Sequence, residues 1–302
     1  MEKRSDSRRA WLQIHFCVIL WGFTAILGKA ILLPALPLVW WRMTIVTAAL
    51  LVVPQFWRGL AKLSLKQFAI FAGIGVLVAL HWLTFYGAIK LSNASVAATC
   101  MALSPVLIAF IEPFIVGRRF AVREALFGLA VIPGVALVVG GTPVLMRMGI
   151  AVGVLSTFFV AAFGSLNKRF VDHGSAICIT GIEMGAGALF LAAIAPLLPG
   201  TETPFLLPDR HDTILLLILA LVCTLLPYAL SLVALKHLSA FTTGLAVNME
   251  PVYAIFLAML FFGEQRELTL PFYIGVGIIC AVVFSYPFLA RRETPERMHI
   301  SQ

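Results

Sequence analysis

The chain has 302 residues, of which 61% are hydrophobic and 12% charged, and its mean hydropathy is +1.00. A soluble domain of this length could not cover its surface with so few polar side chains, so the composition excludes an ordinary soluble protein and indicates one solvated by lipid. The net charge of +8 does not indicate nucleic acid as a partner, because the basic residues gather at the ends of apolar runs.

Ten apolar runs follow one another along the chain, each near the roughly 20 residues that a membrane-spanning helix needs. The runs lack the alternation of membrane strands, so helices are predicted rather than a barrel. The fold expected is an all-α integral membrane protein with ten transmembrane helices. The expected spans are 10–32, 36–57, 67–90, 94–116, 123–142, 148–169, 175–199, 213–236, 239–262 and 270–289.

The first run follows the basic start MEKRSDSRRA, which resembles a signal peptide. The apolar stretch from Trp11 to about Leu33 is too long for one, and no clear small-x-small cleavage site follows it. An uncleaved first span is therefore predicted.

The distribution of Lys and Arg predicts the orientation. If the N-terminus is cytoplasmic, the inner segments hold most of these residues, and the outer segments hold only Lys29, Lys90, Arg147, Arg210 and Arg266. The positive-inside rule then predicts cytoplasmic N- and C-termini in the inner (plasma) membrane. Lys29 is expected to anchor its helix at the membrane interface.

The chain contains an internal repeat. Residues 88–106 and 234–252 align at one offset that matches Pro105 with Pro251, since 251 − 105 = 146. A repeat of about half the chain, in an apolar sequence, is typical of a membrane protein built from two copies of one bundle. Pro105 and Pro251 are predicted to bend their helices.

The two expected halves are residues 1–142 and 143–302, each with five spans, and they meet where GGTPVLMR stops one helix before the next begins. An odd number of spans makes the second half enter the membrane from the opposite side, so inverted repeats are predicted.

The residues after two matched glycines support inversion. Gly117 precedes Arg118 and Arg119, whereas Gly263 precedes Glu264. Basic residues at the inner copy and an acid at the outer copy agree with the positive-inside rule.

The pattern resembles the drug/metabolite transporter (DMT) superfamily, specifically the EamA-type ten-helix permeases. The resemblance rests on WGF at 21–23, on WWR ending at Arg42, on NMEPVYAIFLAMLFFGE at 248–264 and on FYIGVGIICAVVF at 272–284. It implies the transport of small metabolites, often their export, and it does not name the cargo.

Four ionisable residues lie within predicted spans, where a charge costs roughly 2.5 to 3.5 kcal/mol on insertion scales. They are Arg42, His81, Glu183 and Glu250. Glu250 precedes Pro251 and stands where the other half has Ser104. It is predicted to line a central cavity and to bind a cationic group or exchange a proton; the alternative is an acid that only bonds a neighbouring helix at a kink.

Arg42 and Glu183 occupy near-equivalent repeat positions with opposite charge. They could form an ion pair across the pseudo-twofold axis. Alternatively, Arg42 could extend to the membrane surface or attract a substrate carboxylate.

Aromatic side chains recur at matched positions of the two halves. Trp82 and Tyr86 are i,i+4 neighbours, and Tyr228 occupies the repeat position of Trp82, which suggests paired walls of a pocket or ordinary packing. His81 is expected either to be satisfied by a hydroxyl or to carry a proton.

Asn248 and Tyr253 flank the Glu-Pro pair and are candidate hydrogen-bond donors to a ligand. Enzyme signatures such as HExxH, GxSxG and a P-loop are absent from the sequence, so no enzyme is expected. The five cysteines have no CxxC spacing, and no metal, cofactor or nucleic-acid partner is expected.

The sequence predicts a secondary transporter that exports a small polar metabolite, such as an amino acid or a related compound, by alternating access. Its partners would be the lipid bilayer, the substrate and protons as a candidate coupling ion. A non-transporting membrane scaffold or sensor on the same fold is the alternative. A membrane-embedded enzyme is disfavoured by the missing motifs.

Overall fold

The computed structural model describes residues 2–117, 119–120, 122–197, 205–238, 243, 246–247 and 249–290, without the side chains of 2–8, 123–125, 283 and 286–290. All the regular elements within these ranges are helices. The first half of the chain forms α1 (Glu2–Ala30), α2 (Ala35–Leu51), α3 (Pro54–Leu60), α4 (Leu65–Leu91), α5 (Ala94–Met101), α6 (Ser104–Val116), α7 (Val122–Ala130) and α8 (Ile132–Gly141).

The second half begins with the short η1 (Val144–Met146). It continues with α9 (Arg147–Phe170), η2 (Val171–His173), α10 (Ala176–Ile194), η3 (Ala195–Leu197), α11 (Arg210–Leu217), the π-helical segment η4 (Ile218–Leu225), α12 (Leu226–Leu235), α14 (Met249–Phe262), η5 (Glu264–Arg266) and α15 (Leu270–Ala290).

The prediction of ten transmembrane helices is supported only in part. Six helices are long and apolar enough to cross a membrane, and α2 with α3, bent by 90°, would make a seventh. The remaining apolar helices are shorter within the described residues: Leu126–Gly141, Met249–Phe262 and Leu270–Val282. Each predicted run contains a helix, but prolines interrupt several of them, because proline lacks the N–H that continues a helix.

The fourth predicted span is divided into α5 and α6. Asn93 caps α5 by accepting a hydrogen bond from the N–H of Val96, and α5 ends at Met101. The next helix begins at Ser104 with Pro105 in its first turn, where a missing N–H costs nothing. Pro105 therefore lies at the break in this span, whereas the residues before α14 and Pro251 are described only in part.

The repeat is visible in the backbone as well as in the sequence. Gly117 ends α6 with a φ of 77°, and Gly263 ends α14 with a φ of 66°. Glycine reaches this left-handed conformation without the steric cost of a Cβ, and it is the usual residue after a helix end. The two glycines are separated by the repeat offset of 146, since 263 − 117 = 146.

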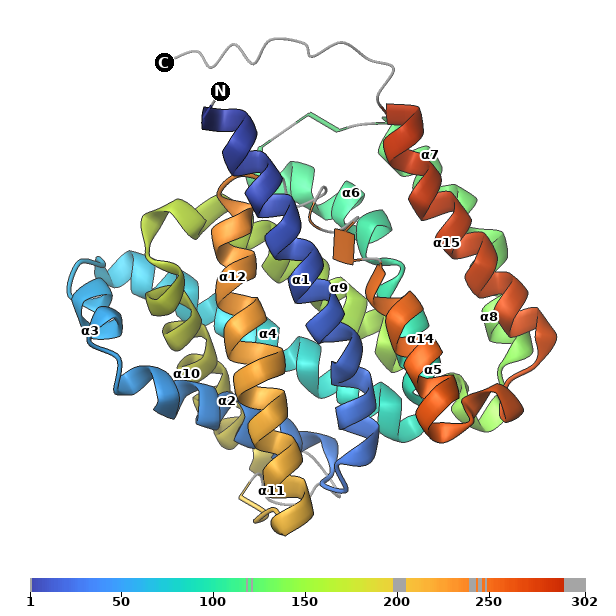
Figure 1. Cartoon of the computed structure of the whole chain (residues 1–302), viewed down its shortest axis with the longest axis horizontal. Helices are drawn as coiled ribbons and strands as arrows, with labels where there is room; N and C mark the ends of the chain where they lie inside the picture. The colour runs from blue at the N-terminus through green and yellow to red at the C-terminus, as the bar shows by residue number, and fades with distance from the viewer. Residues whose placement is uncertain are drawn as a thin grey trace.

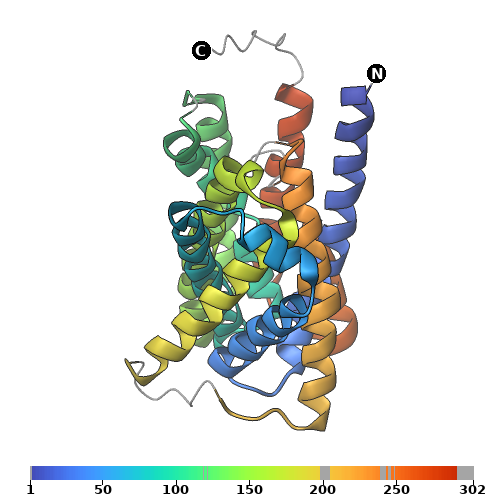
Figure 2. The same cartoon turned by 90° about the vertical axis from the view of Figure 1, so that its left-hand side faces the viewer.

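The two halves are interleaved rather than separate. From the first half, α4 packs against α9 and α10, and α1 packs against α12 and α14. Helices α8 and α15 pair at the edge of the bundle (Figure 1). Figures 1 and 2 show that α1 begins and α15 ends at the same end of the molecule, which we call the terminal end.

Small residues allow close contact between helices at two crossings. A Cβ on Gly275 would lie 2.5 Å from the carbonyl oxygen of Gly134, at the crossing of α15 and α8. A Cβ on Gly75 of α4 would lie 2.2 Å from the carbonyl oxygen of Glu183 on α10. Such small residues are the usual means of close helix packing in membranes, and the second crossing holds Glu183 against α4.

Candidate functional site

A cavity lies between the two halves. Its walls come from α1, α2, α4 and α6 of the first half and from α9, α12 and α14 of the second. Its volume is about 140 Å³, well above the roughly 10 to 15 Å³ that a single water needs, so it has room for a small molecule. The lining is mostly apolar, and Trp21, Trp82, Phe85 and Phe163 supply the aromatic part of it.

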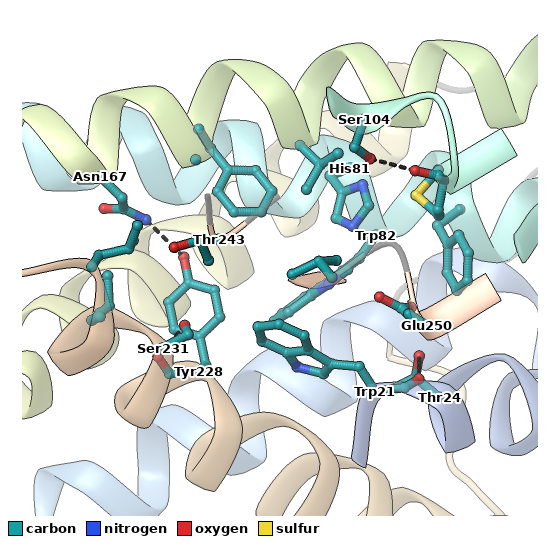
Figure 3. Close-up of a pocket in the computed structure, with 18 of the residues that line it drawn as sticks. Trp21, Thr24, His81, Trp82, Ser104, Asn167, Tyr228, Ser231, Thr243 and Glu250 are labelled. Atoms are coloured by element: carbon teal, nitrogen blue, oxygen red, sulfur yellow. Dashed lines mark hydrogen bonds between the residues drawn. The ribbon is translucent and has the colours of Figure 1, made fainter. Parts of the chain in front are cut away.

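The cavity extends toward the terminal end of the molecule. Asn167 and Leu235, which line it, lie in the last turns of α9 and α12. Figure 3 shows Asn167 and Tyr228 at one side of the cavity and Glu250 at the other, with His81 and Trp82 between them. The polar groups therefore face one another across an apolar space, as in most small-molecule sites.

Arg42 lines the cavity and is 2% exposed. Its Nε donates to the hydroxyl of Thr224 at 2.6 Å, and its Nη1 donates to the hydroxyl of Tyr86 at 2.8 Å. The guanidinium lies over the ring of Trp82, 3.7 Å from the centroid, which is a cation–π contact. The interpretation that Arg42 extends to the membrane surface is therefore wrong, because these three contacts hold it inside the bundle.

The π-helical turn of η4 places the partner of Arg42. The hydroxyl of Thr224 donates to the carbonyl of Leu219, five residues earlier, and thereby turns its oxygen toward Nε of Arg42. Turns of π-helix are rare and are frequent at functional sites. Thr224 belongs to the second half and Arg42 to the first, so this bond joins the two halves at the cavity.

Glu250 lines the same cavity from the first turn of α14. The hydrogen bonds found among the described residues include none from its carboxylate, and it forms no ion pair with Arg42 within 4.0 Å there. The sequence-based expectation that Glu250 faces a cavity agrees with this position. Its counterpart Ser104 also lines the cavity, with its hydroxyl donating to the carbonyl of Met101.

The expected ion pair between Arg42 and Glu183 is not formed. Arg42 contacts Thr224 and Tyr86, whereas Oε2 of Glu183 accepts a hydrogen bond of 2.5 Å from the hydroxyl of Tyr228. Each of the two charged residues is thus bonded to a tyrosine of its own half. The repeat placed them at near-equivalent positions, but their side chains bind different partners.

Glu183 lies behind the cavity wall, with Tyr228 and Asn167 between it and the cavity. Tyr228 and Asn167 line the cavity, and the amide Nδ2 of Asn167 donates to the hydroxyl of Tyr228 at 3.2 Å. The rings of Tyr228 and Trp82 are packed edge to face, with their centroids 6.2 Å apart. The structure therefore brings together the aromatic pair that was expected to form walls of a pocket.

His81 lines the cavity and is bonded to Ser156 on α9. The hydroxyl of Ser156 donates to the carbonyl of His81 at 2.8 Å, and Nδ1 of His81 lies 3.1 Å from the carbonyl of Ser156, which can only accept. Nδ1 therefore carries the hydrogen in the neutral ring, and Nε2 is the acceptor. The hydroxyl oxygen of Ser156 also lies 2.8 Å from Nδ1, so the imidazole has the hydroxyl neighbour that one of the two expectations for His81 named, and the proton-carrying role stays a prediction.

The remaining predicted site residues lie elsewhere. Tyr86 is fully buried beneath Arg42, against Gly28 of α1. Tyr253 does not line the cavity: it is 37% exposed, and its Cβ packs against Gly22. Asn248 lies outside the described residues.

The end of the bundle opposite the terminal end is closed by an ion pair. Nζ of Lys29, at the end of α1, lies 2.7 Å from Oε1 of Glu264, which is 0% exposed. The carboxylate of Glu264 also accepts hydrogen bonds from the N–H groups of Ala94 at 3.1 Å and Ser95 at 2.8 Å, at the start of α5. Lys29 was expected to be an interfacial anchor; it lies in the last turn of α1, and its partly exposed charge is paired with Glu264.

A second carboxylate closes the same end. Oδ1 of Asp212 accepts from the N–H of Leu32 at 2.9 Å, and Oδ2 accepts from the N–H of Leu33 at 2.8 Å. Asp209, His211 and Asp212 place possible metal-ligand atoms within 4.8 Å of one another. Both oxygens of Asp212 already accept hydrogen bonds from backbone N–H groups. The position of this carboxylate is therefore explained by its contact with the segment after α1.

Sequence reasoning missed Asn167, which lines the cavity, and Thr224, which binds the lining residue Arg42. Asn167 is an amide within an apolar helix, and that position is a signal that could have identified it. Thr224 gives no such signal, because threonine is common in membrane helices and only the π-helical turn directs it to Arg42.

Comparison with known proteins identifies a family, a relative and a similar solved structure. The model of the EamA-like transporter family matches residues 9–140 and 147–289. The uncharacterized transporter YyaM of Bacillus subtilis (strain 168) is 25% identical over 229 residues, which cover 72% of this chain and 74% of that protein. A protein known from a crystal structure superposes with a TM-score of 0.65 at 18% identity, covering 94% of this chain and 99% of that one, and has the same fold.

The two matched segments cover most of the chain and correspond to its two halves. The apolar helices and the transporter relative agree with that assignment. The chain is a multi-pass membrane protein and belongs to the EamA-like transporter family.

Proposed function

We propose that this protein is a secondary transporter that exports a small polar metabolite across the inner (plasma) membrane by alternating access. The observation that carries the proposal is the cavity between the halves, in which Arg42 and Glu250 present opposite charges without forming an ion pair among the described residues. A closed structural core would have paired or removed these charges, because unpaired charge within a membrane protein is costly.

The lining favours a zwitterion with an apolar group as the substrate. Two of the five N–H donors of Arg42 bind Thr224 and Tyr86, which leaves donors for a carboxylate. Glu250 would bind an ammonium group, and the aromatic walls would accept an apolar side chain. An amino acid or a related compound has these features and is a small molecule of the kind that such a cavity accepts.

The ends of the bundle support alternating access. The end with Lys29, Glu264 and Asp212 is closed by contacts between the halves, while the cavity extends toward the terminal end. We further propose ten spans in two inverted halves, residues 1–142 and 143–302, with both termini in the cytoplasm. The structure then corresponds to an inward-facing state, and export would require the closure to open.

The transport proposal is tested with purified protein in liposomes. Metabolite profiling of cells with and without the gene would select candidate substrates, and counterflow of each labelled candidate would then be measured. Glu250→Gln and Arg42→Lys are expected to lower counterflow at least tenfold, and the exposed Arg147→Lys, which changes the same chemistry away from the cavity, is expected to leave it unchanged.

Absence of counterflow for every candidate altered by the gene would favour the alternative of a scaffold or sensor on the same fold. The cavity argues against that alternative, because a partner-binding scaffold has no need of charged groups directed into an internal space. Equal flux in wild type and both cavity variants would contradict the assignment of the site.

A further inference from the structure

Glu183 is an acid with almost no polar surroundings. It is 0% exposed in the middle of α10. One carboxylate oxygen, Oε2, accepts from the hydroxyl of Tyr228, and the other, Oε1, has no hydrogen-bond partner among the described residues. A buried polar atom without a partner is rare in native proteins and calls for an explanation.

Among the residues that the structure describes, the helices packed against α10 bring no charged group into contact with this acid. Tyr228 of α12 is the titratable group that faces it, and η3 consists of alanine, proline and leucine. Arg42 of α2 is held on Thr224 and Tyr86 instead. At this stretch of α10 the neighbouring α2, α3 and α4 contribute Met43, Thr47, Phe56 and the backbone of Gly75.

An ionised carboxylate in this position would be an isolated buried charge. Its transfer from water would cost tens of kcal/mol in the Born limit, and groups so placed take up a proton instead. A neutral carboxyl needs an acceptor for its hydrogen. Asn167, which hydrogen-bonds Tyr228 and also contacts Glu183, has a buried Oδ1 that lacks a partner.

We propose that Glu183, Tyr228 and Asn167 form a proton-binding site directly behind the wall of the cavity. The proton is held on Glu183, and Tyr228 exchanges it with the cavity. On loading, the hydroxyl of Tyr228 passes its proton to Oε2 of Glu183 and takes one from a hydronium ion in the cavity, which becomes water. Release reverses both transfers, so protons and charge balance in each direction.

The consequence for transport rests on the proposed function. The transporter would exchange protons at Glu183, behind Tyr228, while the substrate occupies Glu250 on the opposite side of the cavity (Figure 3) and Arg42, which lies over Trp82. Proton and substrate would then bind separate groups whose occupancies are coupled through the cavity wall, and neither would have to displace the other.

Infrared spectroscopy of the purified protein in lipid bilayers tests the site without any transport assay. Wild type is expected to show the C=O stretching band of a protonated carboxyl near neutral pH, and Glu183→Gln is expected to lose it. Tyr228→Phe keeps the acid and is expected to shift the band, because the hydroxyl donor is gone. The variants Glu250→Gln and the half-exposed Glu267→Gln are controls in which this band remains.

A spectrum in which Glu183→Gln removes no carboxyl band would overturn the site. If Glu183→Gln does not fold, Tyr228→Phe decides alone: an unshifted band contradicts the proposal. The proposal would also be overturned if no band of a protonated carboxyl were seen and sodium changed the infrared spectrum only when Glu183 is present. The ligand of Glu183 would then be a metal cation.

Proteoliposomes test the coupling. Wild type is expected to accumulate substrate when a pH gradient is imposed, whereas Glu183→Gln is expected to exchange substrate and to lose the response to the gradient. A carboxyl band that depends on Glu183 in a protein without substrate flux would contradict the transport function and leave the proton site standing. Substrate flux in a protein without such a band would contradict the proton site and leave the transport function standing.

Discussion

Nζ of Lys29 lies 2.7 Å from Oε1 of Glu264, although 235 residues separate them in the chain. The two residues belong to different halves, and the same carboxylate caps the start of α5 through Ala94 and Ser95. One buried acid thus holds together three segments of the closed end: α1, α5 and the turn after α14. This closure would have to break and re-form in each cycle of alternating access.

Replacement of Glu264 by glutamine is expected to destabilise this closed state. The side chain keeps one oxygen acceptor but loses the charge that faces Lys29 and the second acceptor for the N–H groups of α5. The expected loss is about 1 to 3 kcal/mol, measured as a lower thermal midpoint of the detergent-solubilised protein.

The matched control is Glu267→Gln. Glu267 is 40% exposed and lies 3.9 Å from Nζ of Lys29, and an exposed pair of this kind contributes about 1 kcal/mol or less. Equal midpoints for the Glu264 and Glu267 variants would show that the buried pair does not hold the end closed.

Asp212→Asn is expected to weaken the contact between α11 and the turn after α1. The two carboxylate oxygens accept from Leu32 and Leu33, and an asparagine would direct its NH₂ group at one of these N–H groups. A buried unsatisfied donor costs about 1 to 3 kcal/mol. Limited proteolysis is expected to cut the variant faster than the wild type at residues 205–209, directly before α11; identical cleavage would contradict this role.

Arg42→Lys is expected to lower substrate affinity while the protein still folds. Lysine keeps the charge but cannot bond Thr224 and Tyr86 while also lying over Trp82, because it lacks the planar fork of arginine. The apparent Km in liposome uptake should rise at least tenfold. An unchanged Km would place the substrate away from Arg42.

Gly75→Ala is expected to separate α4 from α10. The added Cβ would lie 2.2 Å from the carbonyl oxygen of Glu183, and backbone cannot move aside as a flexible side chain can. Overpacking of this kind costs about 1 to 3 kcal/mol. Gly73→Ala is the control on the same helix, since its Cβ would meet nothing within 4 Å and the change should be neutral or slightly stabilising. Similar melting curves for both variants would refute the tight crossing.

The sequence predicted the helices and the repeat because both depend on local information. A chain segment in lipid must satisfy its own backbone hydrogen bonds, so a long apolar run indicates a helix regardless of its neighbours. The prediction of ten spans is supported only in part, because α2 and α3 are bent by 90° and three apolar helices are shorter within the described residues, whereas Ala94–Val116 is long enough to span in spite of the break between α5 and α6. An apolar run shows which residues lie in the membrane, but it does not show whether the helix they form is continuous.

The contacts of the charged residues could not be predicted from local sequence information. Glu250 was expected to face a cavity and lines one, whereas the ion pair of Arg42 with Glu183, one of the alternatives for these residues, is not formed. Near-equivalent positions in two repeats lie at similar heights along their helices, but a contact also depends on the rotation of each helix.

The sequence by itself determined that this chain is a helical membrane protein built from two related halves, because hydropathy and repeat register are properties of the order of residues. Only the tertiary structure decided that Lys29 binds Glu264, that Arg42 is held by Thr224 and Tyr86, and that Glu183 has Tyr228 as its hydrogen-bond donor. Those contacts join segments far apart in the chain, and they depend on helix packing, which close approach at small residues allows.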